Sequence, residues 1–310
     1  MMPSYLKAYK DKSLEHKIGT ALAILESCEL CPRKCRVNRL ENKKGVCQTG
    51  RHALVASFAP HFGEEAPLVG RYGSGTIFFN GCNLMCAFCQ NYDISHEING
   101  EEIEASKLAD IMLSLQEQKV HNINFVSPSH VVPQILEALP HAIEKGLNIP
   151  LVYNSGGHDS ADTLKLLDGI FDVYMPDFKF SSDLSAIFYC KAPDYPEVVK
   201  SALKEMHRQV GDLVLDENHR AIKGLIVRHL VMPEHVAETK DAMNFLANEI
   251  SENTYVNIMD QYHPCGDISD LPGITRKLTS EEFQEALDEA KAEGITRLDN
   301  RKRAFLFQWR

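Results

Sequence analysis

The sequence lacks several features that mark common classes of protein. It has no run of about 20 apolar residues, and residues 1–10 lack the apolar stretch of a secretory signal, so we expect a cytoplasmic protein with no membrane partner. It has no excess of positive charge, because 43 acidic residues outnumber 33 basic ones and the net charge is −10. This balance argues against a surface built to bind nucleic acid. The Gly-x-Ser-x-Gly, Walker A and HExxH patterns are absent, so acid–base or nucleophilic hydrolysis has little support.

Cysteine is the residue that the chain does have in an unusual arrangement. Seven of its nine cysteines lie between Cys28 and Cys89. Cytosolic thiols are kept reduced, so crowded cysteines in such a chain favour metal binding over disulfides.

Short apolar runs alternate with helical patterns along most of the chain. Helical spacing of apolar residues predicts helices around residues 108–115 and 135–143, and an amphipathic helix over Ser13–Leu25. A further helix is expected after Thr279, with Glu282 completing its N-cap. The six predicted strands are Thr76–Phe79, Ile123–Val126, Ile149–Tyr153, Phe171–Met175, Gly224–Val231 and Tyr255–Met259.

Repeated βα units require parallel strands with right-handed crossovers. The pattern therefore predicts an α/β protein, built either as a doubly wound sheet or as a complete or partial barrel. We expect two parts. Residues 1–75 would form a helix, a Cys-rich module and a linker that is irregular from residue 26 onward, and residues 76–310 would form the main domain with a C-terminal helix.

The loop after the first predicted strand carries the motif CxxxCxxC, formed by Cys82, Cys86 and Cys89. In parallel architectures the loops at the carboxyl ends of the strands build the active site. A [4Fe–4S] cluster commonly takes four cysteines, so three thiolates leave one iron open to a small molecule. The alternative is a structural zinc site, which needs four ligands. No obvious fourth ligand lies near, because His96 after a polar turn is typical of a solvated side chain.

This motif, with Phe88 before its third cysteine, resembles the radical S-adenosylmethionine superfamily. Further stretches resemble the branch of pyruvate formate-lyase activating enzymes: Gln90-Asn91, Tyr153-Asn154-Ser155-Gly156-Gly157, Met175-Pro176-Asp177-Phe178-Lys179 and Gln261-Tyr262-His263-Pro264. The resemblance implies a partial (β/α)6 TIM-like barrel. It also implies a [4Fe–4S] cluster that binds S-adenosylmethionine and cleaves it to a 5'-deoxyadenosyl radical, after reduction by a partner such as flavodoxin or ferredoxin.

The resemblance also implies roles for individual residues. It places Phe88 against the adenine, puts Ser127, Asn154 and Ser155 on the rim of the site, and gives Asp177, Lys179 and His263 polar roles around the methionine end or a bound cation. For Asp177 and Lys179 a structural ion pair at the end of a strand is the alternative. Two positions depart from the family pattern. Val126-Ser127-Pro128-Ser129 stands where Gly-Gly-Glu is common, and Asn154 stands where activating enzymes usually carry aspartate.

Cys28, Cys31, Cys35 and Cys47 form a second group with spacing CxxCxxxCx11C. Four cysteines can close a metal site, which predicts either a structural zinc ion or a second [4Fe–4S] cluster. The group, together with Gly63-Glu64-Glu65, resembles an uncharacterised subgroup of relatives of the activating enzymes. Basic residues around these cysteines are more typical of a solvated face than of a nucleic-acid site, because no interleaved aromatic residues accompany them.

Three functions remain open from the sequence. The leading one is a radical enzyme acting on a protein or peptide, with activation of a glycyl radical enzyme as one subclass. The first rival is a radical enzyme acting on a small molecule. The second is a non-catalytic iron–sulfur or zinc module that serves electron transfer.

Overall fold

The computed structural model describes residues 2–299, so the last eleven residues of the predicted main domain lie outside the described part of the chain. The strands are β1 (Ala53–His61), β2 (Ser74–Phe79), β3 (Glu101–Ile103), β4 (Ile123–Val126), β5 (Leu151–Ser155), β6 (Val173–Pro176), β7 (Val214–Leu215), β8 (Ala221–Leu230) and β9 (Tyr255–Met259). The helices are α1 (Ser4–Lys10), α2 (Ser13–Ala23), α3 (Ala66–Val69), α4 (Tyr92–Ser95), α5 (Ala105–Glu117), α6 (Val132–Glu144), α7 (Ala161–Leu166), α8 (Asp183–Cys190), α9 (Tyr195–Val210), α10 (Thr239–Phe245) and α11 (Ser280–Ala292).

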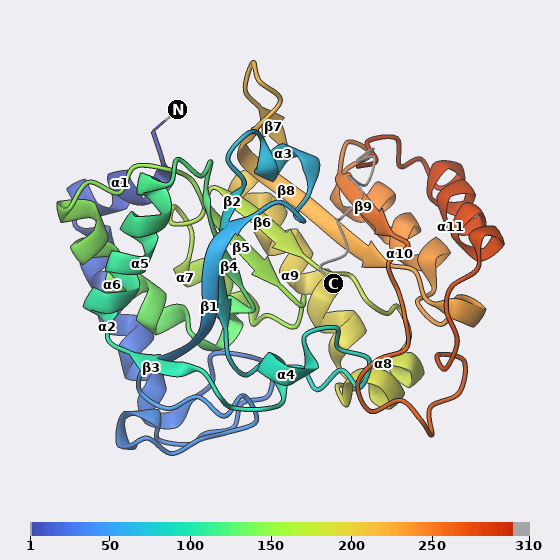
Figure 1. Cartoon of the computed structure of the whole chain (residues 1–310), viewed down its shortest axis with the longest axis horizontal. Helices are drawn as coiled ribbons and strands as arrows, with labels where there is room; N and C mark the ends of the chain where they lie inside the picture. Colours follow the sequence, from blue (N-terminus) through green and yellow to red (C-terminus); the bar gives the residue numbers. More distant parts are fainter. Residues whose placement is uncertain (1, 300–310) are drawn as a thin grey trace, which may run out of the picture.

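Six strands run parallel, in the order β2-β4-β5-β6-β8-β9 (Figure 1). They are the six strands that the sequence predicts, with ends that shift by up to three residues. No ladder within residues 2–299 joins β9 back to β1 or β2, so the sheet is not closed. The prediction of an α/β partial barrel is confirmed.

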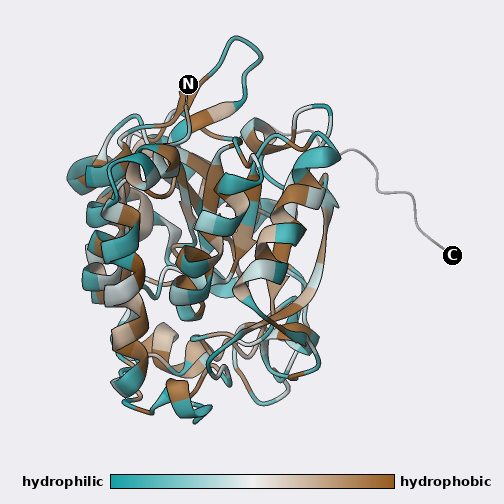
Figure 2. Cartoon of the chain, turned by 90° about the vertical axis from the view of Figure 1, so that its left-hand side faces the viewer, coloured by the Kyte–Doolittle hydropathy of each residue, from teal (hydrophilic) through white to brown (hydrophobic). Residues whose placement is uncertain are grey.

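Helices cover the outside of this sheet. On one side lie α1, α2, α5 and α6, and on the other lie α10 and α11 (Figure 1). The strands are mainly hydrophobic, and the helices carry hydrophilic residues on their outer surfaces (Figure 2). This pattern matches the apolar spacing that predicted α5 and α6, both of which bury one face. At α11, Thr279 and Glu282 form the expected capping box.

The prediction that residues 26–75 are irregular was wrong for residues 53–61. They form β1, which pairs antiparallel with β2 and, over Ala53–Val55, with β3. Pro60 argues against a strand in sequence because proline cannot donate to a ladder. It is tolerated here because β3 does not reach that end of β1, so Pro60 has a neighbouring strand on one side alone. The helices α1 and α3 were also not predicted.

No helix of the described chain is both long enough and apolar enough to cross a bilayer.

A buried histidine makes the stability of this fold depend on pH. His229, on β8, has no exposed surface and contacts the Phe178 carbonyl at 2.7 Å and the Thr239 hydroxyl at 2.9 Å. Burial lowers the pKa of His229 to about 4. The unfolded chain takes up this proton near pH 6.5, so stability is lost as the pH falls from 6.5 toward 4.

We expect His229→Gln to remove part of this pH dependence. Between pH 7.5 and pH 5, the wild type should lose about 2 kcal/mol more unfolding free energy than the variant, as measured by urea titration of metal-free protein. His16→Gln, at an exposed position on α2, should behave like the wild type. Equal losses in the wild type and His229→Gln would show that His229 is not held neutral in the folded state.

Candidate metal centre

The CxxxCxxC motif lies in the loop after β2, at the carboxyl end of the parallel strands. Gly81 begins this loop with a φ of +81°, and a β-carbon there would lie 2.2 Å from the carbonyl oxygen of Cys47. Glycine is therefore required both by conformation and by space. The loop turns tightly at its end, where the Cys89 N–H donates to the Cys86 carbonyl at 3.2 Å.

The end of α8 holds this loop in place. The Ala87 N–H donates to the carbonyl of Tyr189 at 2.9 Å, and the sulfurs of Cys86 and Cys190 lie 3.1 Å apart. At the other end of the motif, the Ser95 hydroxyl donates to the Cys89 sulfur at 3.2 Å. Nothing in the spacing of Cys190 indicated this contact, because the two cysteines are 104 residues apart in the chain.

The pKa of each of the three thiols is raised above its ordinary value. Burial raises the pKa of Cys82 to about 12, with a further contribution from Cys86. The contact with Cys190, together with burial, raises the pKa of Cys86 well above its usual value. A buried thiol remains protonated unless a cation compensates the thiolate, and a bound metal supplies that charge.

A cavity of about 200 Å³ opens beside the three cysteines. Its lining includes all but one of the residues singled out in sequence for this end of the sheet: Cys82, Cys86, Phe88, Cys89, Ser127, Asn154, Ser155, Asp177 and Lys179. They come from the loops after β2, β4 and β6 and from the last two residues of β5. The structure thus brings residues that are nearly 100 positions apart into one place.

His263 is the candidate that the structure does not bring to this cavity. Its side chain is exposed, and its Nδ1 lies 3.3 Å from the carbonyl oxygen of Gln261. Gln261 lines the cavity instead and accepts a hydrogen bond from the Gln90 side chain at 3.0 Å.

The Asn154 side chain is the clearest indication that the cavity binds a ligand. It is buried, it lines the cavity, and its Oδ1 atom has no hydrogen-bond partner. Buried polar atoms are nearly always paired, so an unpaired acceptor at a cavity points to a donor that binds there. Ser155 is already engaged, because its hydroxyl donates to Asp159 at 2.5 Å.

Asp177 is buried and lies between two partly buried cations. Its Oδ2 pairs with Lys179, and its Oδ1 accepts from Arg228 at 2.7 Å. Burial alone would raise the pKa of Asp177, but Arg228 and Lys179 hold it below its usual value. Arg228 also lines the cavity and was not among the sequence candidates. An arginine within the apolar run of a buried strand is a signal that could have identified it.

Two buried acidic side chains, Glu64 and Glu65, lie near Arg228. Asn257 donates to Glu65 at 2.9 Å, and Asn124 donates to Glu64 at 3.0 Å. Burial raises the pKa of Glu65 to about 7, against the opposing effect of Arg228. The Gly63-Glu64-Glu65 motif therefore forms part of a charged network inside the sheet, which extends through Arg228 to Asp177.

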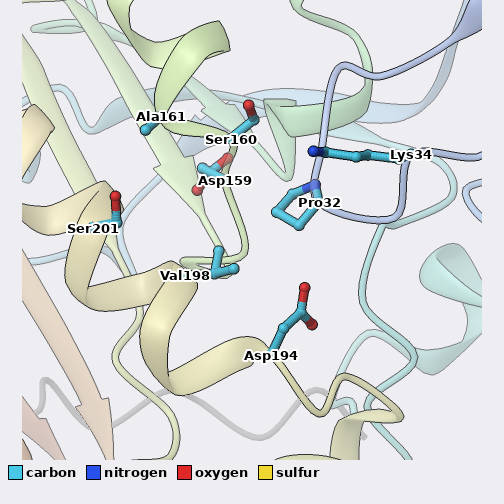
Figure 3. A pocket seen from close by; sticks show the side chains of 8 residues that line it. All are labelled: Pro32, Lys34, Asp159, Ser160, Ala161, Asp194, Val198 and Ser201. Atoms are coloured by element: carbon cyan, nitrogen blue, oxygen red, sulfur yellow. The ribbon is translucent and has the colours of Figure 1, made fainter.

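A second cavity, of about 320 Å³, shares no lining residue with the cavity beside the three cysteines (Figure 3). Its lining comes from the N-terminal segment (Pro32 and Lys34), from the loop at residues 159–161, and from Asp194 with α9. None of the nine cysteines, all of which are described, lines it. The cavity lies at the contact between the N-terminal segment and the barrel. A hydrogen bond of 2.8 Å from the Thr163 hydroxyl to the Leu30 carbonyl also joins these two parts.

The fold and this site define a parallel α/β protein with a three-cysteine metal centre at the carboxyl ends of its strands. The model of the radical SAM superfamily matches residues 76–246, just over half of the chain. The chain belongs to the radical SAM superfamily. Membership implies an enzyme with a [4Fe–4S] cluster and S-adenosylmethionine as cofactors.

Similar proteins add the following. The uncharacterized protein MJ0674 of Methanocaldococcus jannaschii is 33% identical over 92% of this chain and 80% of its own length. The uncharacterized protein MJ0808 of the same organism is 24% identical over 79% of this chain and 73% of its own length. Neither name specifies a substrate.

Two solved structures share the fold at low identity. A radical SAM methyltransferase from Sphaerobacter thermophilus has a TM-score of 0.50 at 13% identity, over 71% of this chain. The FeFe-hydrogenase maturase HydG from Carboxydothermus hydrogenoformans has a TM-score of 0.51 at 10% identity, over 72% of this chain. The chain covers 64% and 51%, respectively, of the lengths of these two proteins.

Proposed function

We propose that this enzyme cleaves S-adenosylmethionine reductively at a cluster held by Cys82, Cys86 and Cys89, and abstracts hydrogen from a protein or peptide. The observation that carries the proposal is the cavity where these thiols lie beside the unpaired Asn154 oxygen. When bound, the reduced cluster supplies the electron that converts S-adenosylmethionine to methionine and the 5'-deoxyadenosyl radical.

The residues around the cavity fit the groups of S-adenosylmethionine. Asn154 offers an acceptor to its ammonium group, and Lys179 offers N–H donors to its carboxylate. Phe88 is buried at the cavity and packs edge-on against Phe180, with ring centroids 5.8 Å apart. This packing fixes the Phe88 ring as an apolar surface for the adenine. Asp177 holds Lys179 and Arg228 in position.

A protein or peptide substrate is favoured by the apolar face of α8. Leu184, Ile187 and Phe188 are 68%, 44% and 55% exposed, and their spacing places them on one side of the helix. The same helix ends at Cys190, which contacts Cys86. Exposed apolar side chains on one face of a helix mark an interaction site, and the buried side of this helix contacts the loop of the metal centre through Cys190. A polypeptide with an apolar segment is the substrate that this surface suits, and activation of a glycyl radical enzyme is one form of such a reaction.

Reduction requires an external electron source. We propose a low-potential carrier protein of the flavodoxin or ferredoxin type, because cleavage of S-adenosylmethionine consumes one electron for each molecule.

The substrate class can be tested with deuterium. Cells of the source organism are grown in D2O, and their lysate is separated by size into macromolecular and small-molecule fractions. Each fraction is incubated anaerobically with reduced enzyme and unlabelled S-adenosylmethionine. We expect deuterium in 5'-deoxyadenosine with the macromolecular fraction, and loss of that signal after protease treatment. Deuterium from the small-molecule fraction alone would refute a protein or peptide substrate.

The role of α8 is tested in the same assay. Replacing Leu184 and Phe188 together by serine should lower deuterium transfer from the macromolecular fraction at least about tenfold, since fully burying a Leu or Phe side chain contributes about 1.5–3 kcal/mol. Val214→Ser is the matched control, because Val214 is 48% exposed but lies on β7. Unchanged transfer in the double variant would exclude this face from substrate binding.

A further inference from the structure

The N-terminal cysteines are gathered by a tightly folded loop. The Cys28 N–H donates to the Val37 carbonyl and the Arg36 N–H donates back to the Cys28 carbonyl, both at 3.0 Å. At Gly45 a β-carbon would lie 2.7 Å from the Cys35 sulfur, so this glycine lets the segment that carries Cys47 approach Cys35. Cys28, Cys31 and Cys47 are buried although the surrounding module is small.

The spacing of these four sulfurs distinguishes between metals. A zinc ion bound by four thiolates at 2.3 Å in tetrahedral geometry holds their sulfurs about 3.8 Å apart. Among residues 2–299, the group of three potential ligands within 4.8 Å of one another is His235, Glu285 and Glu289, and no three of the N-terminal cysteines meet that limit. A [4Fe–4S] cluster needs a wider arrangement, because each thiolate binds a different iron.

The sulfurs of the first centre are also not clustered as closely as a zinc ion requires. Cys82, Cys86 and Cys89 also do not lie within 4.8 Å of one another. Neither group therefore brings three sulfurs as close together as one tetrahedral zinc ion requires, and a cluster, in which each thiolate binds a different iron, does not require such closeness.

Arg39 supplies an independent indication of a negatively charged ligand. Its side chain is 1% exposed, its Nη1 lies 3.8 Å from the Cys28 sulfur, and its Nη2 has no hydrogen-bond partner. Its other contacts are the carbonyls of Gly50 at 3.0 Å and His130 at 2.8 Å. Across residues 2–299 no carboxylate forms an ion pair with it. A buried cation is costly unless it is paired, so its partner must come from what these cysteines bind.

The group also lies against the loop of the first centre. The carbonyl oxygen of Cys47 approaches Gly81, the residue before Cys82. Arg33 donates to the Asn83 carbonyl at 2.9 Å and to the Lys191 carbonyl at 2.5 Å. In Figure 1 the loops that follow α2 (blue) and α4 both lie at the lower edge of the molecule.

We propose that Cys28, Cys31, Cys35 and Cys47 hold a second [4Fe–4S] cluster, and that Arg39 compensates its negative charge. With a core of charge +2 and four thiolates, such a cluster carries a net charge of about −2. The guanidinium beside Cys28 offsets part of this charge, and its unpaired Nη2 is available as a donor to a cluster sulfur. This inference does not depend on the substrate or on cleavage of S-adenosylmethionine.

Counting metal in a variant without the first centre tests the proposal. Cys82, Cys86 and Cys89 are all replaced by alanine, and the protein is purified and reconstituted anaerobically. We expect about four iron and four sulfide per chain, against about eight of each in the wild type, with a [4Fe–4S]⁺ signal in electron paramagnetic resonance after reduction. One zinc per chain without sulfide, or neither metal nor sulfide, would overturn the proposal.

The role of Arg39 is tested in that triple variant. Adding Arg39→Gln should shift the midpoint potential of the cluster to more negative values, because reduction then adds charge without a nearby cation, and Arg39→Lys should restore part of the shift. Arg36→Gln is the matched control, since Arg36 is exposed and pairs with Glu29. An unchanged potential in Arg39→Gln would refute charge compensation. If that variant does not fold, the iron and sulfide count of the triple variant still decides whether the cluster exists.

Discussion

Replacing Cys86 by alanine is expected to abolish the formation of 5'-deoxyadenosine. Cys86 is the middle cysteine of the motif, is buried at the cavity, and is one of three thiols that would hold the cluster. Losing a residue that merely supports a metal ligand costs about 10–100-fold, so losing a ligand itself should cost more than about a hundredfold. The measurement is chromatographic assay of 5'-deoxyadenosine after anaerobic reconstitution, reduction with dithionite and addition of S-adenosylmethionine.

Cys265→Ala is the control for this prediction. Cys265 is a partly buried cysteine whose sulfur contacts the Phe88 carbonyl at 3.3 Å, and it does not line the cavity. This variant should bind iron and cleave S-adenosylmethionine like the wild type. If Cys86→Ala retained the wild-type rate, the three-cysteine assignment would be wrong. If the fully loaded wild type formed no product even with cell extract present, the proposed catalytic function would fail and the electron-transfer alternative would gain support.

Replacing Asp177 by asparagine should destabilise the fold by about 3–5 kcal/mol, because removing one partner of a buried ion pair leaves an uncompensated charge. Here two cations, Lys179 and Arg228, would lose their shared carboxylate. The measurement is the unfolding free energy of the metal-free protein from urea titration at pH 7.5.

Two further variants make this prediction specific. Asp110→Asn breaks an exposed ion pair with Lys145 and should leave the unfolding midpoint unchanged, because exposed pairs contribute little. Combining Asp177→Asn with Arg228→Met should recover part of the lost stability, since one unpaired charge is removed with its partner. A stability of Asp177→Asn equal to that of the wild type would show that the ion network does not support the fold.

The sequence anticipated the parallel strands well because their signal is local. A buried parallel strand is a short, nearly continuous apolar run, and each of the six predicted runs is a strand in the structure. The sequence did not predict β1, because alanines and Pro60 interrupt its apolar run. Its pairing with β2 depends on residues about 20 positions away, and propensity does not report such contacts.

In the candidate site, too, the residues of one local motif could be predicted and the contacts between distant residues could not. Cys82, Cys86 and Cys89 could be found in sequence because the three cysteines lie within eight residues of one loop, so their spacing alone predicts a metal site. The contact of Cys190 with Cys86 spans 104 residues, and that of Arg228 with Asp177 spans 51. Neither pair has a spacing that a reader of the sequence could recognise.

By itself, the sequence determined the parallel α/β class, the three-cysteine motif and the membership of the radical SAM superfamily, because strand burial and loop ligands are encoded by neighbouring residues. Only the tertiary structure decided that Asn154 has an unpaired oxygen at the cavity, that Arg39 lies beside Cys28, and that Cys190 at the end of α8 contacts Cys86. These features arise where separate segments pack together, and packing between distant segments is set by the whole fold rather than by any local pattern.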